Sequence, residues 1–340
     1  MALLRGLSRV ITACVVAIVV VLLGFRVAAA IRESRPRGTA APSGGRFVHA
    51  ADVDMFVQEA GPDDGVPVVL IHGTGAWSEI WRETLDTLAA EGFHAIALDM
   101  PPFGYSQRPA NANYGDAAQA RRILGVIEAL RLPQVVLVGH SFGARPTVEA
   151  VLRAPSLVRS LVLVDAALDL HMPVTVPPSG PSVVRLAPPS VRNALVAATL
   201  TNPLLTRRLL QTLIARDEAA TTERVQMLQR PFSVLGTTAA FGDWLVPFVT
   251  VRERSLSTDP KRIHSLRVPA LVIWGDRDEI TPLAQGRELA ALLPNAQLKV
   301  LRGVGHIPAI EASGAFNGAL IDFLRPLESQ ERRALSAEGR

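Results

Sequence analysis

Short apolar runs alternate with longer amphipathic stretches through most of the chain after residue 46. The runs are rich in β-branched residues, whereas the stretches between them carry apolar residues at helical spacing. Runs without polar interruption are typical of strands that are buried on both faces of a parallel sheet. We therefore predict an α/β fold with a mostly parallel sheet and helices on both faces. Its strands cover 68–71, 94–98, 134–138, 160–164, 270–274 and 297–301, and an antiparallel edge pair precedes them at 47–49 and 55–58.

One interval interrupts this alternation, because no clear strand pattern occurs between Asp165 and Val268. It carries helical patterns at 191–200, 204–216 and 222–228, separated by proline-rich breaks. Helices inserted at this point lie over the carboxyl ends of the strands, where they cover a site. We predict a helical lid at 166–268, an α/β core at 46–165 and 269–328, and a C-terminal tail at 329–340.

The N-terminal segment is the most apolar part of the chain. Residues 10–25 carry no charge, and with their neighbours they are long enough to cross a bilayer as a helix. The alternative is a cleaved signal peptide, because the start is basic and residues 28–30 are small. We predict a transmembrane anchor at 1–32, with secretion after cleavage as the alternative. Arginines flank the segment on both sides, so their distribution does not determine on which side of the membrane the folded domain lies.

Residues 33–45 are rich in proline, glycine, serine and alanine and show no apolar periodicity. This composition predicts a flexible linker between the N-terminal segment and the folded domain.

The composition narrows the class of protein. Of 340 residues, 49% are hydrophobic and 19% are charged, which is typical of a folded domain with a sizeable core. Lys and Arg together number 35 against 31 for Asp and Glu, so no nucleic-acid partner is indicated. Cys14 is the single cysteine, which excludes an intrachain disulfide and a cysteine-based metal site. The oligomeric state is not indicated.

The clearest candidate for chemistry is Ser141, in the sequence GHSFG at 139–143. This matches G-x-S-x-G and lies between a predicted strand and a predicted helix. A tight strand-to-helix turn needs small residues and exposes the serine hydroxyl at the start of the helix. We predict that Ser141 is a nucleophile; the alternative is an ordinary serine that caps the helix.

A serine hydroxyl attacks a carbonyl only if a base takes its proton and a carboxylate orients that base. His306 follows the predicted strand at 297–301, and Asp278 follows the one at 270–274. We predict that His306 is the base and Asp278 the acid, with Asp276 and Asp165 as alternative acids. The competing interpretation is that His306 packs a loop and Asp278 caps a helix.

The oxyanion that forms during acyl transfer needs two backbone N–H donors. Phe142 follows the nucleophile at the start of the helix, and Thr74 lies in the glycine-flanked turn HGTG at 72–75. We predict that these two amides form the oxyanion hole, although the turn could also be purely structural.

The motifs HGTG, DMPPFGYS, GHSFG, GDRDEITP and GVGHIP, in this order over 47–327, resemble the α/β-hydrolase superfamily. The likeness is to its lidded branch of carboxylesterases, carbon–carbon bond hydrolases, prolyl aminopeptidases and cofactor-free haloperoxidases. The resemblance implies that the acid is Asp278, four residues before Pro282. A serine nucleophile disfavours the dehalogenase and epoxide hydrolase branches, which form an ester on aspartate. Ala144 departs from the family, which often has a second glycine there.

We therefore expect a serine hydrolase that cleaves a carboxylic ester or similar acyl bond of a small apolar substrate through an acyl-enzyme. No cofactor or metal is implied. The same triad could instead transfer the acyl group to another acceptor or support perhydrolysis. A non-catalytic ligand-binding member of the fold would be favoured by loss of a triad residue, and no loss is seen.

Overall fold

One eight-stranded sheet organises the computed structural model, which describes residues 2–170, 187–250 and 255–338. The strand order is β1-β2-β4-β3-β5-β6-β7-β8. β2 pairs antiparallel with β1 and β4, and the remaining neighbours are parallel. This confirms the predicted α/β hydrolase-type sheet. The strands are β1 (Gly45–Ala50), β2 (Val53–Ala60), β3 (Pro67–Ile71), β4 (His94–Leu98), β5 (Val135–His140), β6 (Val158–Val164), β7 (Ala270–Gly275) and β8 (Ala296–Leu301).

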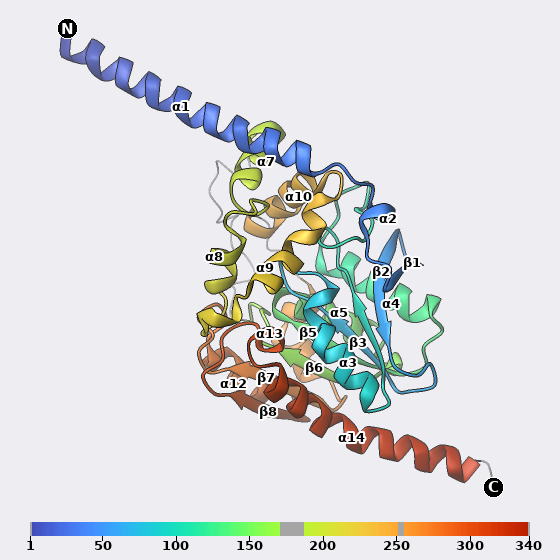
Figure 1. Ribbon diagram of the computed structural model, residues 1–340. Helices are drawn as coiled ribbons and strands as arrows, with labels where there is room; N and C mark the ends of the chain where they lie inside the picture. The colour runs from blue at the N-terminus through green and yellow to red at the C-terminus, as the bar shows by residue number, and fades with distance from the viewer. Residues whose placement is uncertain (1, 171–186, 251–254, 339–340) are drawn as a thin grey trace.

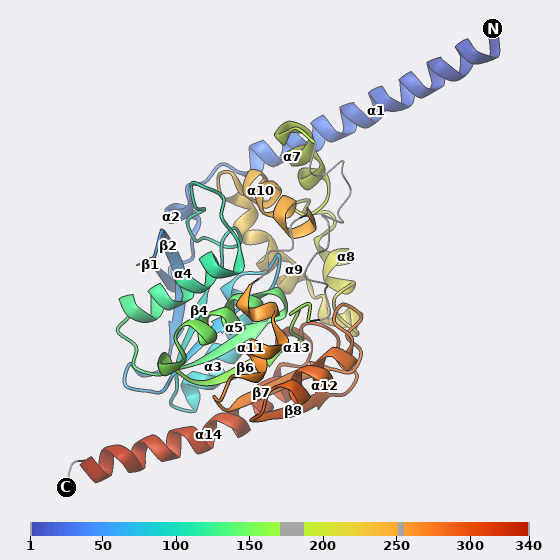
Figure 2. The same ribbon diagram turned by 180° about the vertical axis from the view of Figure 1, so that it is seen from behind.

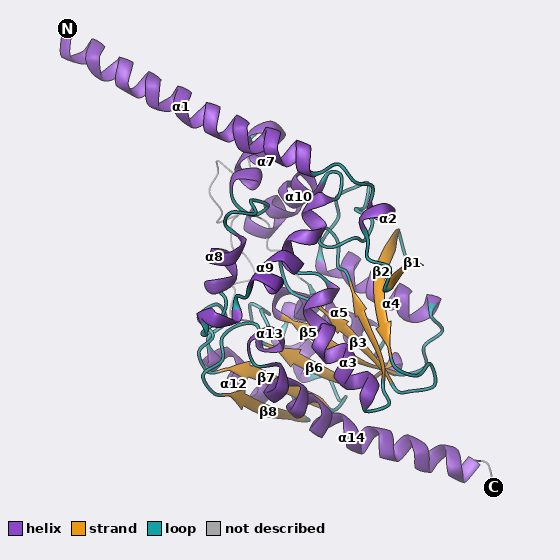
Figure 3. Cartoon of the chain, in the orientation of Figure 1, coloured by secondary structure: helices purple, strands orange, loops and turns teal. Residues whose placement is uncertain are grey.

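Helices cover both faces of the sheet, as Figure 3 shows. Successive side chains of a strand point to opposite faces, so Val69 and Ile71 of β3 enter one core and Val68 and Leu70 the other. The first core is closed by α4 (Asp116–Ala129), α5 (Ala144–Arg153), α11 (Pro260–His264) and α12 (Leu283–Leu292). The second is closed by α3 (Arg82–Ala90), α13 (Pro308–Glu311) and α14 (Ser313–Glu338).

The described residues between β6 and β7 are helical apart from their connections, as the sequence predicts. The lid, by which we mean residues 189–250, contains α7 (Pro189–Ala198), α8 (Thr206–Gln211), α9 (Thr222–Gln229) and α10 (Thr237–Thr250). It lies at one end of the sheet (Figure 1). The helical patterns predicted α7, α8 and α9, whereas α10 is an addition from the structure. Residues 171–186 and 251–254 of the predicted insertion lie outside the described residues.

The helix α1 (Ala2–Arg32) projects from the lid side of the molecule, and α14 projects from the opposite side (Figures 1 and 2). By length and composition, residues Arg5–Arg32 could cross a membrane. Their apolar side chains are mostly exposed, with Val20 at 61%. Only the last turns of α1 touch the body, where Ala29 is buried and α1 lies against α7. The predicted C-terminal tail at 329–340 continues α14 as far as Glu338.

Residues 33–45 differ from the flexible linker that their composition predicts. The buried Glu33 carboxylate accepts hydrogen bonds from the amide and the hydroxyl of Thr238 in α10. The backbone of Arg35 exchanges hydrogen bonds with the lid, donating to Ser233 O at 3.1 Å and accepting from Leu235 N at 2.9 Å. The short helix α2 (Arg37–Ala40) follows. The segment therefore fastens the end of α1 to the lid.

Candidate active site

The turn between β5 and α5 holds Ser141 in an uncommon conformation. Its φ is +52°, a left-handed value that L-residues other than glycine rarely adopt. A Cβ added at Gly143 would overlap the carbonyl oxygen of His72, so only glycine allows the two loops to approach this closely. The strand-turn-helix predicted from GHSFG is therefore present, and it projects the serine side chain from the carboxyl end of β5.

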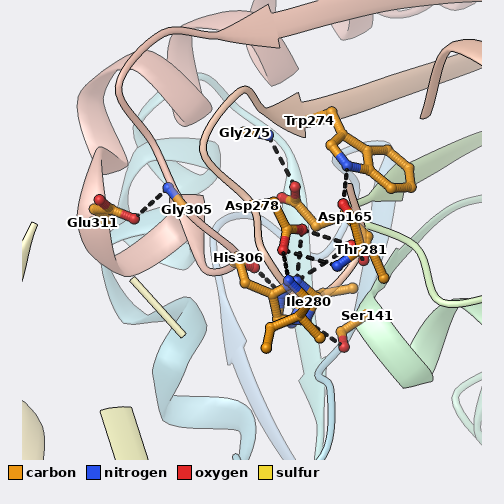
Figure 4. A network of polar contacts seen from close by, with 11 residues as sticks. Ser141, Asp165, Trp274, Gly275, Asp278, Ile280, Thr281, Gly305, His306 and Glu311 are labelled. Atoms are coloured by element: carbon orange, nitrogen blue, oxygen red, sulfur yellow. Dashed lines mark hydrogen bonds and ion pairs between the residues drawn. The ribbon is translucent and has the colours of Figure 1, made fainter. Parts of the chain in front are cut away.

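Ser141, His306 and Asp278 form one hydrogen-bonded chain across three loops at the carboxyl ends of strands (Figure 4). His306 Nε2 lies 2.7 Å from Ser141 Oγ, and His306 Nδ1 lies 2.7 Å from Asp278 Oδ2. All three residues are buried. This is the geometry that a general base and its orienting carboxylate require.

Hydrogen bonds keep the Asp278 side chain ionised and fixed. Its Oδ1 accepts from the amides of Ile280 at 2.8 Å and Thr281 at 2.9 Å, and its Oδ2 accepts from the Thr281 hydroxyl at 2.6 Å. Burial alone would raise the pKa of Asp278, but the hydrogen bonds from His306 and Thr281 outweigh it and hold the pKa below its usual range. An ionised Asp278 accepts from His306 Nδ1–H, which leaves Nε2 free to take the proton of Ser141.

The two alternative acids do not bond to His306. The exposed Asp276 uses Oδ1 to accept the amide of Gly303 at 2.6 Å. The buried Asp165 uses Oδ1 to accept the amide of Gly275 at 2.9 Å. Of the three predicted candidates, the structure brings Asp278 to the histidine.

Three further residues fix the loops that carry His306 and Asp278, and the sequence motifs alone did not identify them. Glu311 accepts the amides of Ala215 at 2.9 Å and Gly305 at 2.7 Å. His140 donates from Nε2 to the main-chain oxygen of His306 at 2.7 Å. Burial lowers the pKa of His140 to about 3, so its ring is neutral. The third residue, Thr281, lies inside the GDRDEITP motif, which is the one sequence signal that could have found it.

The loop after β3 lies directly against the nucleophile. A Cβ added at Gly73 would be 2.8 Å from the Cβ of Ser141. His72 fixes this loop, since its Nδ1–H donates to Gly73 O at 2.7 Å and its Nε2 accepts the amide of Met100 at 2.9 Å. Burial lowers the pKa of His72 to about 4, which preserves the neutral ring that this acceptor needs.

Both residues predicted for the oxyanion hole, Thr74 and Phe142, line the same pocket as Ser141 and His306. The pocket has a volume of about 360 Å³. Its lid side is aliphatic and aromatic apart from Thr206 and Thr212, and none of the described residues that line the pocket is Lys, Arg, Asp or Glu. The lid contributes Leu200, Leu209, Leu213, Leu228, Trp244 and Phe248. No group of three His, Cys, Asp or Glu side chains in the described ranges is placed to hold a metal ion.

A family model described as alpha/beta hydrolase fold matches residues 66–313, and the chain belongs to this family of hydrolases. It is 32% identical to a 2-hydroxymuconate semialdehyde hydrolase from Pseudomonas sp. (strain CF600), over 83% of this chain and 94% of that protein. A solved meta-cleavage product hydrolase from Pseudomonas fluorescens IP01 is 27% identical, with a TM-score of 0.68 over 83% of this chain and 98% of its own.

A solved membrane phospholipase A, described as a bacterial virulence factor, is 24% identical with a TM-score of 0.65. The match covers 95% of this chain and 97% of the other, so it takes in part of the segment before β1. At this identity the likeness concerns the fold.

Proposed function

We propose that this protein is a serine hydrolase that cleaves an ester, or a similar acyl bond, of a neutral apolar substrate. The observation that carries the proposal is the Ser141–His306–Asp278 chain beside an apolar pocket. His306 takes the proton of Ser141, whose oxygen attacks the carbonyl to form an acyl-enzyme. The amides of Thr74 and Phe142 stabilise the oxyanion. His306 then activates a water molecule that releases the acid.

Carbon–carbon bond hydrolysis is the second candidate, because relatives are hydrolases of that kind. The 2-hydroxymuconate semialdehyde hydrolase acts, as its name states, on a muconate derivative and therefore on a carboxylate. A carboxylate removed from water needs a cationic or strongly hydrogen-bonding partner. The described pocket lining offers neither Lys nor Arg, and its lid side offers the hydroxyl groups of Thr206 and Thr212 among apolar side chains. An uncharged ester therefore suits this pocket better than a dienoate.

The apolar pocket predicts that turnover depends on acyl chain length. Burying one methylene group contributes about 0.8 kcal/mol, so kcat/KM for p-nitrophenyl esters should rise about fourfold per methylene until the pocket is filled. The measurement uses the full chain in detergent micelles with esters from acetate to octanoate. A 2-hydroxy-6-oxo-dienoate is the competing substrate. A higher kcat/KM for the dienoate than for every ester would replace the ester proposal with carbon–carbon hydrolysis.

We also propose that α1 anchors the enzyme in a membrane with the lid toward the bilayer. The last turns of α1 lie against α7, and Glu33 is bonded to α10, so the lid lies next to the end of the apolar helix. Exposed apolar side chains occur on this part of the lid, among them Val191 at 46%, Leu195 at 41% and Leu204 at 82%. Such side chains suit the boundary between headgroups and acyl chains.

Fractionation distinguishes an anchor from a cleaved signal. Full-length protein with an N-terminal tag should remain in the membrane after an alkaline carbonate wash. The variant Val15→Arg/Val19→Arg should move to the soluble fraction, because each arginine near the bilayer centre costs about 2.5–3.5 kcal/mol. Leu157→Arg, at an exposed site away from α1, is the control and should stay in the membrane. A soluble, shortened wild-type chain without its tag would show cleavage instead.

A further inference from the structure

Asp165 occupies a special position at the end of β6. It is fully buried, and its φ of +43° is left-handed, which is uncommon for a residue other than glycine. Its amide donates to Ile273 O in β7 at 3.0 Å, which joins the ends of the two strands. The turn places the carboxyl group of Asp165 beside the loop that carries Asp278 (Figure 4).

The Asp165 carboxyl group has too few donors for an ionised group. Its Oδ1 accepts one hydrogen bond, from the amide of Gly275 at 2.9 Å. Its Oδ2 is buried and receives no N–H or O–H of a described residue. The neighbour of the group is the Asp278 carboxyl, which lies beside it in Figure 4. Two carboxyl groups can share a hydrogen bond only if one of them is protonated.

The surroundings assign the proton to Asp165. Asp278 is the better anion, because the amides of Ile280 and Thr281 and the His306 ring donate to it whichever way the Thr281 hydroxyl points. The titratable groups that face Asp165 are Asp278 and His306 from the loops after β7 and β8, and Glu311 from α13. Burial, and after it the negative charges of Asp278 and Glu311, raise the pKa of Asp165 well above its usual range.

Asp278 can accept from Asp165 when the Thr281 hydroxyl turns away from it. A carboxylate offers about four lone-pair positions. The Thr281 hydroxyl has a single hydrogen and two acceptors within reach, Asp278 Oδ2 at 2.6 Å and the main-chain oxygen of Asp165 at 3.2 Å. When this hydrogen points to Asp165 O, the position it leaves on Asp278 can accept a hydrogen bond from Asp165.

We propose that Asp165 is a positioning residue that stays a neutral carboxylic acid and donates its Oδ2–H to the carboxylate of Asp278. This role rests on the proposed function of the triad. The hydrogen bond gives Asp278 a further fixed partner besides His306 and its own loop. Because Asp165 carries no charge, it adds no repulsion to the ionised Asp278.

Infrared spectroscopy tests the protonation state without relying on catalysis. The full chain labelled with ¹³C-aspartate should show the C=O stretch of a buried carboxylic acid at pH 7. That band should be lost in Asp165→Asn and kept in Ser141→Ala. If the protein proved not to be a serine hydrolase, this band would be unchanged. The experiment therefore tests the protonation of Asp165 independently of the proposed hydrolysis. A wild-type spectrum identical to that of Asp165→Asn in the carboxylic acid region would overturn the assignment.

The pH profile tests the positioning role. Asn at 165 keeps a donor for Asp278 and an acceptor for Gly275 N–H but cannot ionise. We expect its kcat/KM at pH 7 to stay within about threefold of wild type, whereas Asp165→Ala should lose more than tenfold. Wild type should lose activity at alkaline pH as Asp165 ionises beside Asp278, and Asp165→Asn should lack that decline. An Asn variant as inactive as Ala, or one that retains the alkaline decline, would overturn the proposal.

Discussion

Replacement of Ser141 by alanine should lower kcat on an apolar ester by about 10⁴- to 10⁶-fold, because Ser141 supplies the one hydroxyl bonded to His306 Nε2 among the described residues. Ser141 Oγ lies 2.7 Å from His306 Nε2, and the turn that holds it is fixed by the close approach of Gly143 to His72. Alanine fits this turn with the loss of one oxygen atom, so the fold should persist. The measurement is steady-state turnover of the preferred ester together with labelling by a fluorophosphonate.

The matched control is Ser156→Ala, which removes an exposed hydroxyl outside the pocket and should leave turnover and labelling unchanged. The double variant Ser141→Ala/His306→Ala should be scarcely worse than Ser141→Ala, since residues of a triad act as a unit. If Ser141→Ala retains labelling and turnover near the wild-type level, the nucleophile is elsewhere. If wild type itself shows neither, a ligand-binding role takes the place of the proposed hydrolysis.

The sheet could be predicted from sequence because its strands are buried on both faces. The run at 68–71 has no polar residue, and all of β3 is buried in the structure. Periodicity failed for α10 because that helix is apolar nearly all round and contains Pro247. Phe241 and Trp244 pack in an aromatic cluster that includes Phe103 and Tyr114 from outside the lid. The exposed Phe248 on the same helix is also apolar, so no continuous polar face marks the helical period.

Composition misled the prediction for residues 33–45 because their partners are distant in sequence. Proline, glycine and serine indicate a chain that lacks a core of its own. The bonds that order the segment come from Thr238, Ser233 and Leu235, roughly two hundred residues later. A buried carboxylate such as Glu33 needs hydrogen-bond donors, but the sequence does not show which residues donate to it.

Motif order predicted that Ser141 and His306 lie together, because each follows a strand whose carboxyl end lies at the same edge of the sheet. It could not determine which carboxylate bonds to His306. Asp276 and Asp278 share the loop after β7, and Asp165 follows β6, which pairs with β7, so all three follow strands that end at the same edge of the sheet. Which carboxylate reaches His306 depends on side-chain direction, which sequence spacing does not determine.

Replacement of Asp278 by asparagine should lower kcat by about 10³- to 10⁴-fold. An asparagine side chain offers one acceptor oxygen, whereas Asp278 uses both oxygens to accept from Ile280, Thr281 and His306. The amides of Ile280 and Thr281 hold that oxygen, so the NH₂ group of the new side chain faces His306 Nδ1. Nδ1 must then accept a hydrogen bond, which puts the ring proton on Nε2 and removes the base from Ser141.

Asp276→Asn is the matched control from the same loop. Its exposed side chain keeps an oxygen for the amide of Gly303, so kcat should change by less than about twofold. The measurement is kcat at pH 7 for both variants and for Asp165→Asn, with near-ultraviolet circular dichroism to verify the fold. A large loss in Asp276→Asn with a small one in Asp278→Asn would reverse the two assignments. Asp276 and Asp278 are two positions apart on one loop, so a general disturbance of that loop would lower kcat in both variants. A loss of kcat in Asp278→Asn alone must therefore come from its contact with His306.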